Sequence, residues 1–201
     1  MFDKIIKSEF NGKIIEHGIV QGDNTILLIK VGQNGSIVGY RDKYLKMAKN
    51  INSKYDATVI CVSNPFDGKN PLDITMDLID ELSEEKDWPN VRIYYLGISN
   101  GGLVGAWYGH LYPEIEKMML VNMPIQVRNY NYTISGIKAS EADEKILVYG
   151  ELDHSCIYLD LLDELISEND IKLEIVPGQD HNFTFGMTDF ITLPEKYFFR
   201  D

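Results

Sequence analysis

Continuous apolar runs recur along this chain, and the stretches between them are long enough for one amphipathic segment each. The runs are short, rich in β-branched and aromatic residues, and end close to glycine, serine or asparagine. Such runs are typical of strands that are covered on both faces. They predict six buried strands: residues 25–32, 57–63, 91–98, 117–123, 145–150 and 171–176.

The segments between these runs carry helical periodicity or breaks. Four of them are predicted as helices: residues 37–51 behind the candidate N-cap Ser36, an acidic segment at 72–85, residues 101–112 ahead of Pro113, and residues 157–168. Residues 64–68 interrupt the pattern after the second strand with proline and glycine.

The first twenty residues differ from the rest, because two β-type stretches flank Asn11–Gly12, a favourable two-residue turn. This pattern predicts a hairpin over residues 2–20. After it, strand and helix signals alternate regularly, which favours right-handed crossovers. The expected fold class is α/β, a doubly wound, mostly parallel sheet with helices on both faces. Ligand sites in such sheets lie at the carboxyl ends of the strands.

No repeat or linker divides the chain, so residues 1–201 are expected to form a single domain. Apolar residues make up 44% and charged residues 25%, and no segment approaches the roughly 18 apolar residues of a membrane-spanning helix. We therefore expect a soluble protein. The first residues lack the apolar core and cleavage site of a secretory signal, so a cytoplasmic location is expected.

The net charge of −12 makes nucleic acid and anionic membranes poor partners. Cys61 and Cys156 are too few for a disulfide framework, and with four scattered histidines they form no metal-ligand spacing. We expect reduced thiols and neither a metal nor another cofactor. The oligomeric state is left open.

Ser99 is the first candidate for chemistry. Gly97-Ile98-Ser99-Asn100-Gly101 has the pattern G-x-S-x-G at the junction of a predicted strand and helix. It resembles the nucleophile elbow of the α/β-hydrolase family, in which a sharp turn strains the serine backbone and flanking glycines avoid clashes. A strand-ending turn without chemistry is the alternative. The resemblance extends from about Thr25 to the C-terminal helix and implies an α/β-hydrolase-like fold.

A serine hydroxyl needs an imidazole to accept its proton and a carboxylate to orient that imidazole. The resemblance implies the chain order serine, acid, histidine. His181, in the loop after the last predicted strand, is the expected base, and His154 is second choice. We expect His17 to be an exposed or half-exposed strand residue and His110 to be structural.

Asp153 is the expected acid, because it follows the strand at 145–150 by the spacing of the family's acid loop. Glu151 is an alternative, although its position directly after the terminal glycine should point it away from the base. Asp180 is adjacent to His181, and neighbouring side chains in an extended loop diverge.

Acyl transfer also needs two N–H donors for the carbonyl oxygen as it becomes negative. The backbone N–H of Asn100 is expected to be the first donor. Gln33, after the strand at 25–32, is expected to be the second, with Gly32 as an alternative. Val31 stands where many relatives have histidine, so this loop departs from the family pattern.

Many relatives insert a helical cap ahead of the acid strand. Here only residues 124–144 are available, which is enough for a short excursion and too little for a full lid, so little or no cap domain is expected. Candidates for lining a substrate pocket, or alternatively for plain packing, are Met123, Tyr130, Tyr132, Phe183 and Met187.

Together these residues predict a cofactor-independent serine hydrolase that cleaves a small carboxylic ester through an acyl-enzyme. Thioester or amide cleavage uses the same groups and remains an alternative. A binding protein that keeps the fold without turnover is the alternative from a different class. A nucleotide-binding module is disfavoured because the loop after residues 25–32 lacks a glycine-rich phosphate motif.

Overall fold

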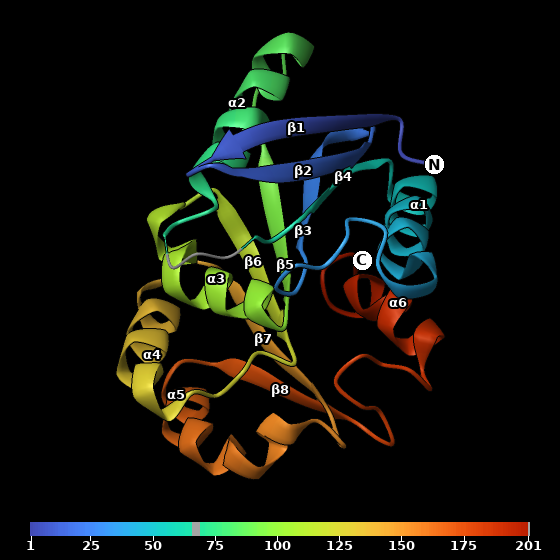
Figure 1. Ribbon diagram of the computed structural model, residues 1–201. Coiled ribbons are helices and arrows are strands. Elements are labelled where there is room, and N and C mark those ends of the chain that lie inside the picture. Colours follow the sequence, from blue (N-terminus) through green and yellow to red (C-terminus); the bar gives the residue numbers. More distant parts are fainter. Residues whose placement is uncertain (66–68, 201) are drawn as a thin grey trace.

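Figure 1 presents a computed structural model that describes residues 1–65 and 69–200. Residues 66–68 of the predicted interruption at 64–68 thus lie outside the described residues.

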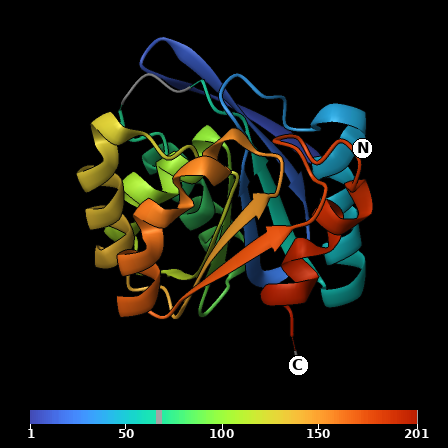
Figure 2. The same ribbon diagram turned by 90° about the horizontal axis from the view of Figure 1, so that it is seen from below.

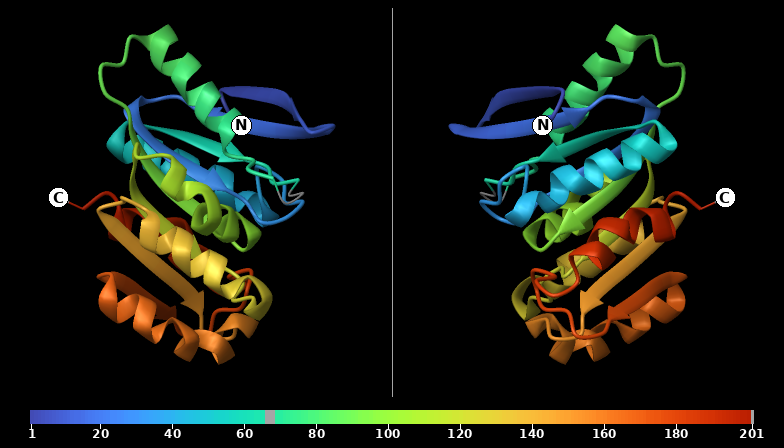
Figure 3. Two further views of the ribbon diagram at one scale, coloured as in Figure 1. Left: turned by 90° about the vertical axis from the view of Figure 1, so that its left-hand side faces the viewer. Right: turned by 90° about the vertical axis from the view of Figure 1, so that its right-hand side faces the viewer.

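In the described part of the chain, eight strands form one sheet, in the order β1-β2-β4-β3-β5-β6-β7-β8. β1 and β2 form the predicted N-terminal hairpin, and β2 pairs antiparallel with β4. The strands from β3 to β8 run parallel. Figure 3 shows the hairpin at one end of the sheet and β8 at the other. The strands are β1 (Lys4–Phe10), β2 (Lys13–Val20), β3 (Asp23–Lys30), β4 (Ala57–Val62), β5 (Arg92–Ile98), β6 (Ile115–Val121), β7 (Glu144–Gly150) and β8 (Ile171–Val176).

Helices cover both faces of this sheet (Figure 2). α1 (Lys43–Tyr55) and α6 (Met187–Tyr197) pack on one face. The other face carries α2 (Asp73–Lys86), α3 (Asn100–Tyr108), α4 (Tyr130–Ala139) and α5 (Asp163–Glu168). Because the parallel strands are buried on both faces, their sequences are continuously apolar, which is why their pattern could be recognised. The predicted doubly wound, mostly parallel sheet is confirmed.

The predicted helix at 37–51 begins later than expected, at Lys43. Gly39, Arg41 and Asp42 have φ angles of 72°, 52° and 59°, which a continuing right-handed helix does not allow. Ser36 accepts a hydrogen bond from the Gly39 N–H at 3.2 Å, so it closes a turn and does not cap α1.

The predicted helix at 157–168 also differs, because its first half is a 3₁₀ segment, His154–Leu162, followed by the short α5. The third predicted helix is α3 continued by a 3₁₀ turn, Gly109–Leu111, directly before Tyr112 and Pro113.

The excursion at 124–144 forms a 3₁₀ turn (Val127–Asn129) and α4. α4 is part of the helical layer, since the Trp107 indole N–H donates to Thr133 Oγ at 2.8 Å. At Gly136, an added Cβ would lie 2.0 Å from the Ala106 carbonyl oxygen, so the two helices are in close contact. The excursion packs on α3 within the helical layer and does not form a lid, as predicted.

No helix within residues 1–65 and 69–200 combines the length and the apolar character that crossing a bilayer requires.

Candidate active site

Ser99 lies on a tight turn between β5 and α3, with φ 54° and ψ −122°. A Cβ on Gly97 would lie 2.5 Å from the Gly101 carbonyl oxygen, and a Cβ on Gly101 would lie 2.1 Å from that of Lys30. Both distances are too short for any side chain, so only glycine allows the chain to turn here. The structure thus has a strained turn with flanking glycines at Ser99, and its action as a nucleophile elbow stays a prediction.

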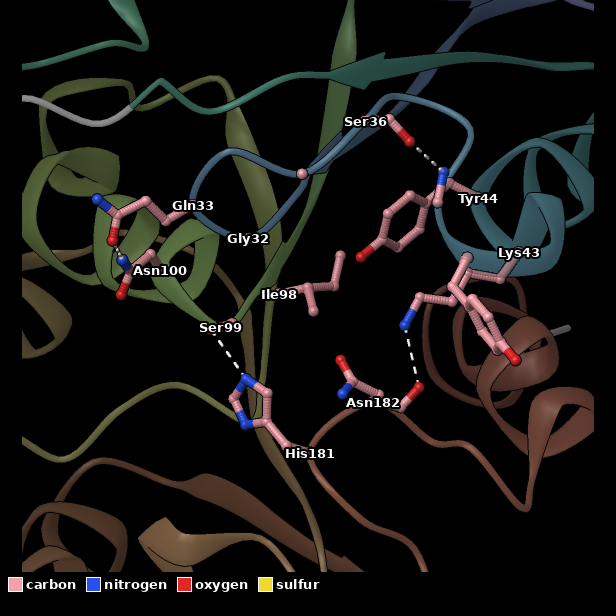
Figure 4. Close-up of a pocket in the computed structure, with 13 residues that line it drawn as sticks. Gly32, Gln33, Ser36, Lys43, Tyr44, Ile98, Ser99, Asn100, His181 and Asn182 are labelled. Carbon is pink, nitrogen blue, oxygen red and sulfur yellow. Dashed lines mark hydrogen bonds between the residues drawn. The ribbon is translucent and has the colours of Figure 1, made fainter.

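The turn presents the Ser99 hydroxyl to His181, whose Nε2 lies 3.0 Å from Oγ (Figure 4). The other ring nitrogen, Nδ1, is hydrogen-bonded to the Asp153 carboxylate. Ser99 follows β5, Asp153 follows β7 and His181 follows β8. The structure therefore joins residues that are far apart in sequence at the carboxyl edge of the sheet, where the sequence places them.

Asp153 is held as a buried carboxylate, with a side chain that is 1% exposed. Burial alone would raise the pKa of its carboxyl group. Hydrogen bonds from His181 and from the Ser155 backbone N–H, at 2.7 Å, outweigh this effect, so the pKa of Asp153 lies below its ordinary value. A charged Asp153 can orient the imidazole and stabilise its protonated form.

The alternative acids have other partners. Glu151 accepts from the Gly178 N–H at 2.8 Å, and Asp180 accepts from the N–H groups of Asn182 and Thr184. His154, the second-choice base, is exposed at the start of the 3₁₀ segment.

His17 corrects an expectation, because it is fully buried and not an exposed hairpin residue. β2 pairs with β4 on one side, and the Thr75 hydroxyl of α2 lies 3.1 Å from the His17 Nε2.

The two predicted oxyanion residues lie beside each other. The Asn100 side-chain amide donates to Gln33 Oε1 at 2.6 Å, which links the β3 loop to the start of α3 (Figure 4). Gly32 is close to the nucleophile, because a Cβ there would lie 3.3 Å from the Ser99 Cβ. Their backbone N–H groups stay predicted donors.

A pocket of about 400 Å³ opens at Ser99. Its lining is formed by the loop and helix start after β3, the β5–α3 turn and the His181 loop: Gly32, Gln33, Gly35, Ser36, Gly39, Tyr40, Lys43, Tyr44, Ile98, Ser99, Asn100, His181 and Asn182. Within the described part of the chain, no cluster of three or more histidine, cysteine or acidic residues is placed to hold a metal ion.

None of the five candidates for lining a pocket lines this cavity in the described chain, which favours the alternative of plain packing. Met123 and Phe183 are buried in the two cores. Tyr130 donates to the Leu161 carbonyl, Tyr132 packs on Trp107, and Met187 begins α6. For Met123 and Phe183, the apolar character reflects core packing.

Asn122, directly after β6, is a buried residue that the sequence analysis did not single out. Its Oδ1 accepts from the Gly150 N–H at 2.8 Å, and its Nδ2 donates to the His181 carbonyl at 2.8 Å. Asn122 thereby fixes the acid loop and the histidine loop relative to each other. The available signal was an asparagine at the end of a buried strand, on the edge where the other site residues gather.

Lys43 is the second residue that was missed, and it lines the pocket from the first turn of α1. It lies at helical spacing from Tyr40 and Met47, and a lysine on this apolar face was the available signal.

Solved structures with the same fold span almost the whole chain. An α/β serine hydrolase homologue from Coxiella burnetii aligns with a TM-score of 0.71 and 10% identity, covering 98% of each chain. An α/β serine hydrolase without lid from Xanthomonas campestris aligns at 0.69 and 15% identity, covering 96% of this chain and 92% of its own. A thioesterase domain from the curacin biosynthetic pathway aligns at 0.66 and 12% identity, covering 94% and 98%.

No family model matches the sequence, and no curated protein matches it. The structural likeness establishes the fold, which is that of the α/β-hydrolases with little or no cap.

Proposed function

We propose that this protein of α/β-hydrolase fold is a cofactor-independent serine hydrolase that cleaves small carboxylic esters through an acyl-enzyme. The observation that carries the proposal is the continuous hydrogen-bonded series from Asp153 through His181 to Ser99, which ends at an open pocket. A hydroxyl alone is a weak nucleophile, and this series supplies the base and the group that orients it.

The contacts assign a role to each residue. With a proton on Nδ1 held by Asp153, the Nε2 of His181 accepts the Ser99 proton while Oγ attacks the ester carbonyl carbon. The backbone N–H groups of Asn100 and Gln33 stabilise the oxygen that becomes negative. The carbon–oxygen bond to the alcohol then breaks, and His181 gives the proton to the departing alcohol.

The second half of the cycle restores the serine. A water molecule gives a proton to His181 Nε2 and attacks the acyl carbon. The bond to Ser99 Oγ breaks, the carboxylic acid leaves, and the proton returns to Oγ. A thioester would follow the same steps with a thiol as leaving group. The curacin thioesterase domain supports including such substrates in the test.

The acyl-enzyme is the intermediate that a binding protein without turnover cannot form. Brief incubation with 4-nitrophenyl acetate, followed by acid quenching and intact mass measurement, is expected to add one acetyl group, located on the peptide that contains Ser99. In His181→Ala the acetylation should be far slower, because Ser99 has lost its base. Nitrophenol release that Ser99→Ala retains, or acetylation that His181→Ala does not slow, would contradict the proposal. Parallel assays with acetyl thioesters compare the two leaving groups.

A further inference from the structure

The pocket at Ser99 differs in charge from the rest of the protein. The chain has 31 acidic and 19 basic residues apart from histidine. Among the described residues that line the pocket, Lys43 carries a positive charge, and no aspartate or glutamate is present. In this acidic protein, the lining of the pocket beside the candidate nucleophile thus contains a lysine and no carboxylate.

Lys43 is directed into this pocket. Its side chain starts at the first residue of α1 and is nearly sealed by neighbours, with 5% of the residue exposed. Nζ donates a hydrogen bond to the Asn182 carbonyl at 3.0 Å, and Figure 4 shows the nitrogen on the pocket side, facing the site. The amine also lies 4.6 Å from the centre of the Phe190 ring.

These contacts leave the charge of Lys43 only partly compensated. An ammonium group has three donors, and the Asn182 carbonyl accepts from one of them. Lys43 takes part in none of the ion pairs formed within the described chain. Asp180 acts on it from a distance and uses its carboxylate on the Asn182 and Thr184 N–H groups.

A partly desolvated cation gains most from an anion that binds it directly. We propose that Lys43 binds a carboxylate on the substrate, so that the preferred esters carry a free carboxylate in addition to the ester group. This inference rests on the proposed hydrolase function and names its substrate class. A single cation in a pocket of about 400 Å³ suits a small monoanion. A phosphate monoester would bring roughly two negative charges to one amine.

A purely structural role for Lys43 makes a different prediction. The bond to the Asn182 carbonyl would then tether the His181 loop to α1, and losing it would slow all esters alike. Selectivity between charged and neutral esters therefore separates substrate binding from tethering.

The test compares mono-4-nitrophenyl esters of succinate, glutarate and adipate with the neutral 4-nitrophenyl ester of equal carbon number, after subtraction of spontaneous hydrolysis. At one chain length the wild type should favour the carboxylated ester in kcat/KM. In Lys43→Met that ratio should fall ~10- to 100-fold, mainly through a higher KM, as expected for a hydrogen bond to a charged group. Lys43→Arg should retain part of the preference.

Lys46→Met is the matched control, because Lys46 is an exposed residue of the same helix and loses the same charge. It should keep the wild-type ratio. A wild type that favours the neutral ester at every length would overturn the inference, and so would an equal ratio in wild type and Lys43→Met. The first of these outcomes does not depend on how well any variant folds.

A binding measurement separates this inference from the proposed function. Monomethyl adipate, titrated calorimetrically into Ser99→Ala, should bind more tightly than to Ser99→Ala/Lys43→Met. The wild type could hydrolyse neutral esters through Ser99 while Lys43→Met leaves the affinity for monomethyl adipate unchanged. In that case the hydrolase function stands and the carboxylate site is refuted. If no ester is hydrolysed and Lys43 still governs binding, the hydrolase proposal fails and the anion site stands.

Discussion

His181 and His17 lie in two different regions of the molecule, and each imidazole contacts one side-chain hydroxyl at a similar distance. The Nε2 of His181 is 3.0 Å from the Ser99 hydroxyl, and the Nε2 of His17 is 3.1 Å from the Thr75 hydroxyl. In each pair the imidazole comes from a strand or from the loop after one, and the hydroxyl comes from the N-terminal part of a helix or the turn before it. By this contact alone, either imidazole could activate its hydroxyl.

The two imidazoles differ in their surroundings. His181 has a carboxylate on its second nitrogen and a side chain that is 39% exposed beside a pocket. His17 is fully buried, and its Nδ1 has no hydrogen-bond partner within the described chain. Burial, followed by the charge of Lys30, lowers the pKa of His17 to about 4.

Lys30 makes the second region unsuitable for proton transfer to a substrate. Its buried amine donates to the Ser63 carbonyl at 2.8 Å, and burial lowers its pKa to about 7. The neighbouring Lys30 cation opposes protonation of His17, whereas the charged neighbour of His181 is the Asp153 carboxylate. The comparison shows that an imidazole–hydroxyl contact becomes a candidate site only with a carboxylate and access to solvent.

The largest expected difference between the regions comes from removing each hydroxyl. Ser99→Ala should lower kcat on 4-nitrophenyl esters by roughly 10⁶-fold, because no other group can form the acyl-enzyme. Thr75→Ala should leave kcat within about twofold, since Thr75 is buried beside His17 and away from the pocket at Ser99. Steady-state kinetics of both variants, with circular dichroism as the folding control, make the test. Comparable losses would remove the distinction between the two hydroxyls.

Replacing the carboxylate should have the next largest effect. Asp153→Asn keeps the shape of the side chain and loses the charge that orients His181, so kcat should fall by roughly 10⁴-fold. Stopped assays over several hours can measure the residual rate. An activity close to that of the wild type would mean that Glu151 or Asp180 supplies the acid.

The pH dependence of stability should show the effect of burying His17. Below pH 6.5 the unfolded chain protonates His17, whereas the folded chain resists protonation down to about pH 4. The free energy of unfolding of the wild type should thus fall as the pH drops through this window, by roughly 3 kcal/mol from His17. His17→Gln should lose this part of the slope in urea titrations. Parallel curves for the two proteins would contradict the assignment.

The smallest effect concerns the bond between the two oxyanion residues. Gln33→Ala removes the acceptor for the Asn100 side chain, a hydrogen bond of about 1 kcal/mol. We expect kcat to fall by about fivefold with little change in KM, because the positions of the backbone donors are less restricted. Ser36→Ala, in the same loop, is the matched control and should have a smaller effect.

The sequence predicts the sheet well because parallel strands covered on both faces leave continuous apolar runs. It also predicts the meeting of Ser99, Asp153 and His181, since parallel strands deliver their loops to one edge. Local backbone geometry was harder to predict from the sequence. The delayed start of α1 depends on positive φ at Arg41 and Asp42, residues that often continue helices.

The parts of the site that the sequence did not reveal are set by tertiary contacts. Asn122 and Lys43 belong to no motif, and their roles follow from the loops that pack around them. Phe183 was expected as a pocket candidate, yet its ring packs on Phe190 at 5.3 Å between ring centres. Apolar character cannot distinguish a core residue from a pocket residue.

The central claim is that His181 and Asp153 make Ser99, and no other hydroxyl, strongly nucleophilic. Treatment with a fluorophosphonate, followed by peptide mapping by mass spectrometry, tests it directly. We expect one adduct on Ser99, slow labelling in His181→Ala, and no adduct in Ser99→Ala. A well-folded wild type that stays unlabelled, or that is labelled at another residue, would contradict it.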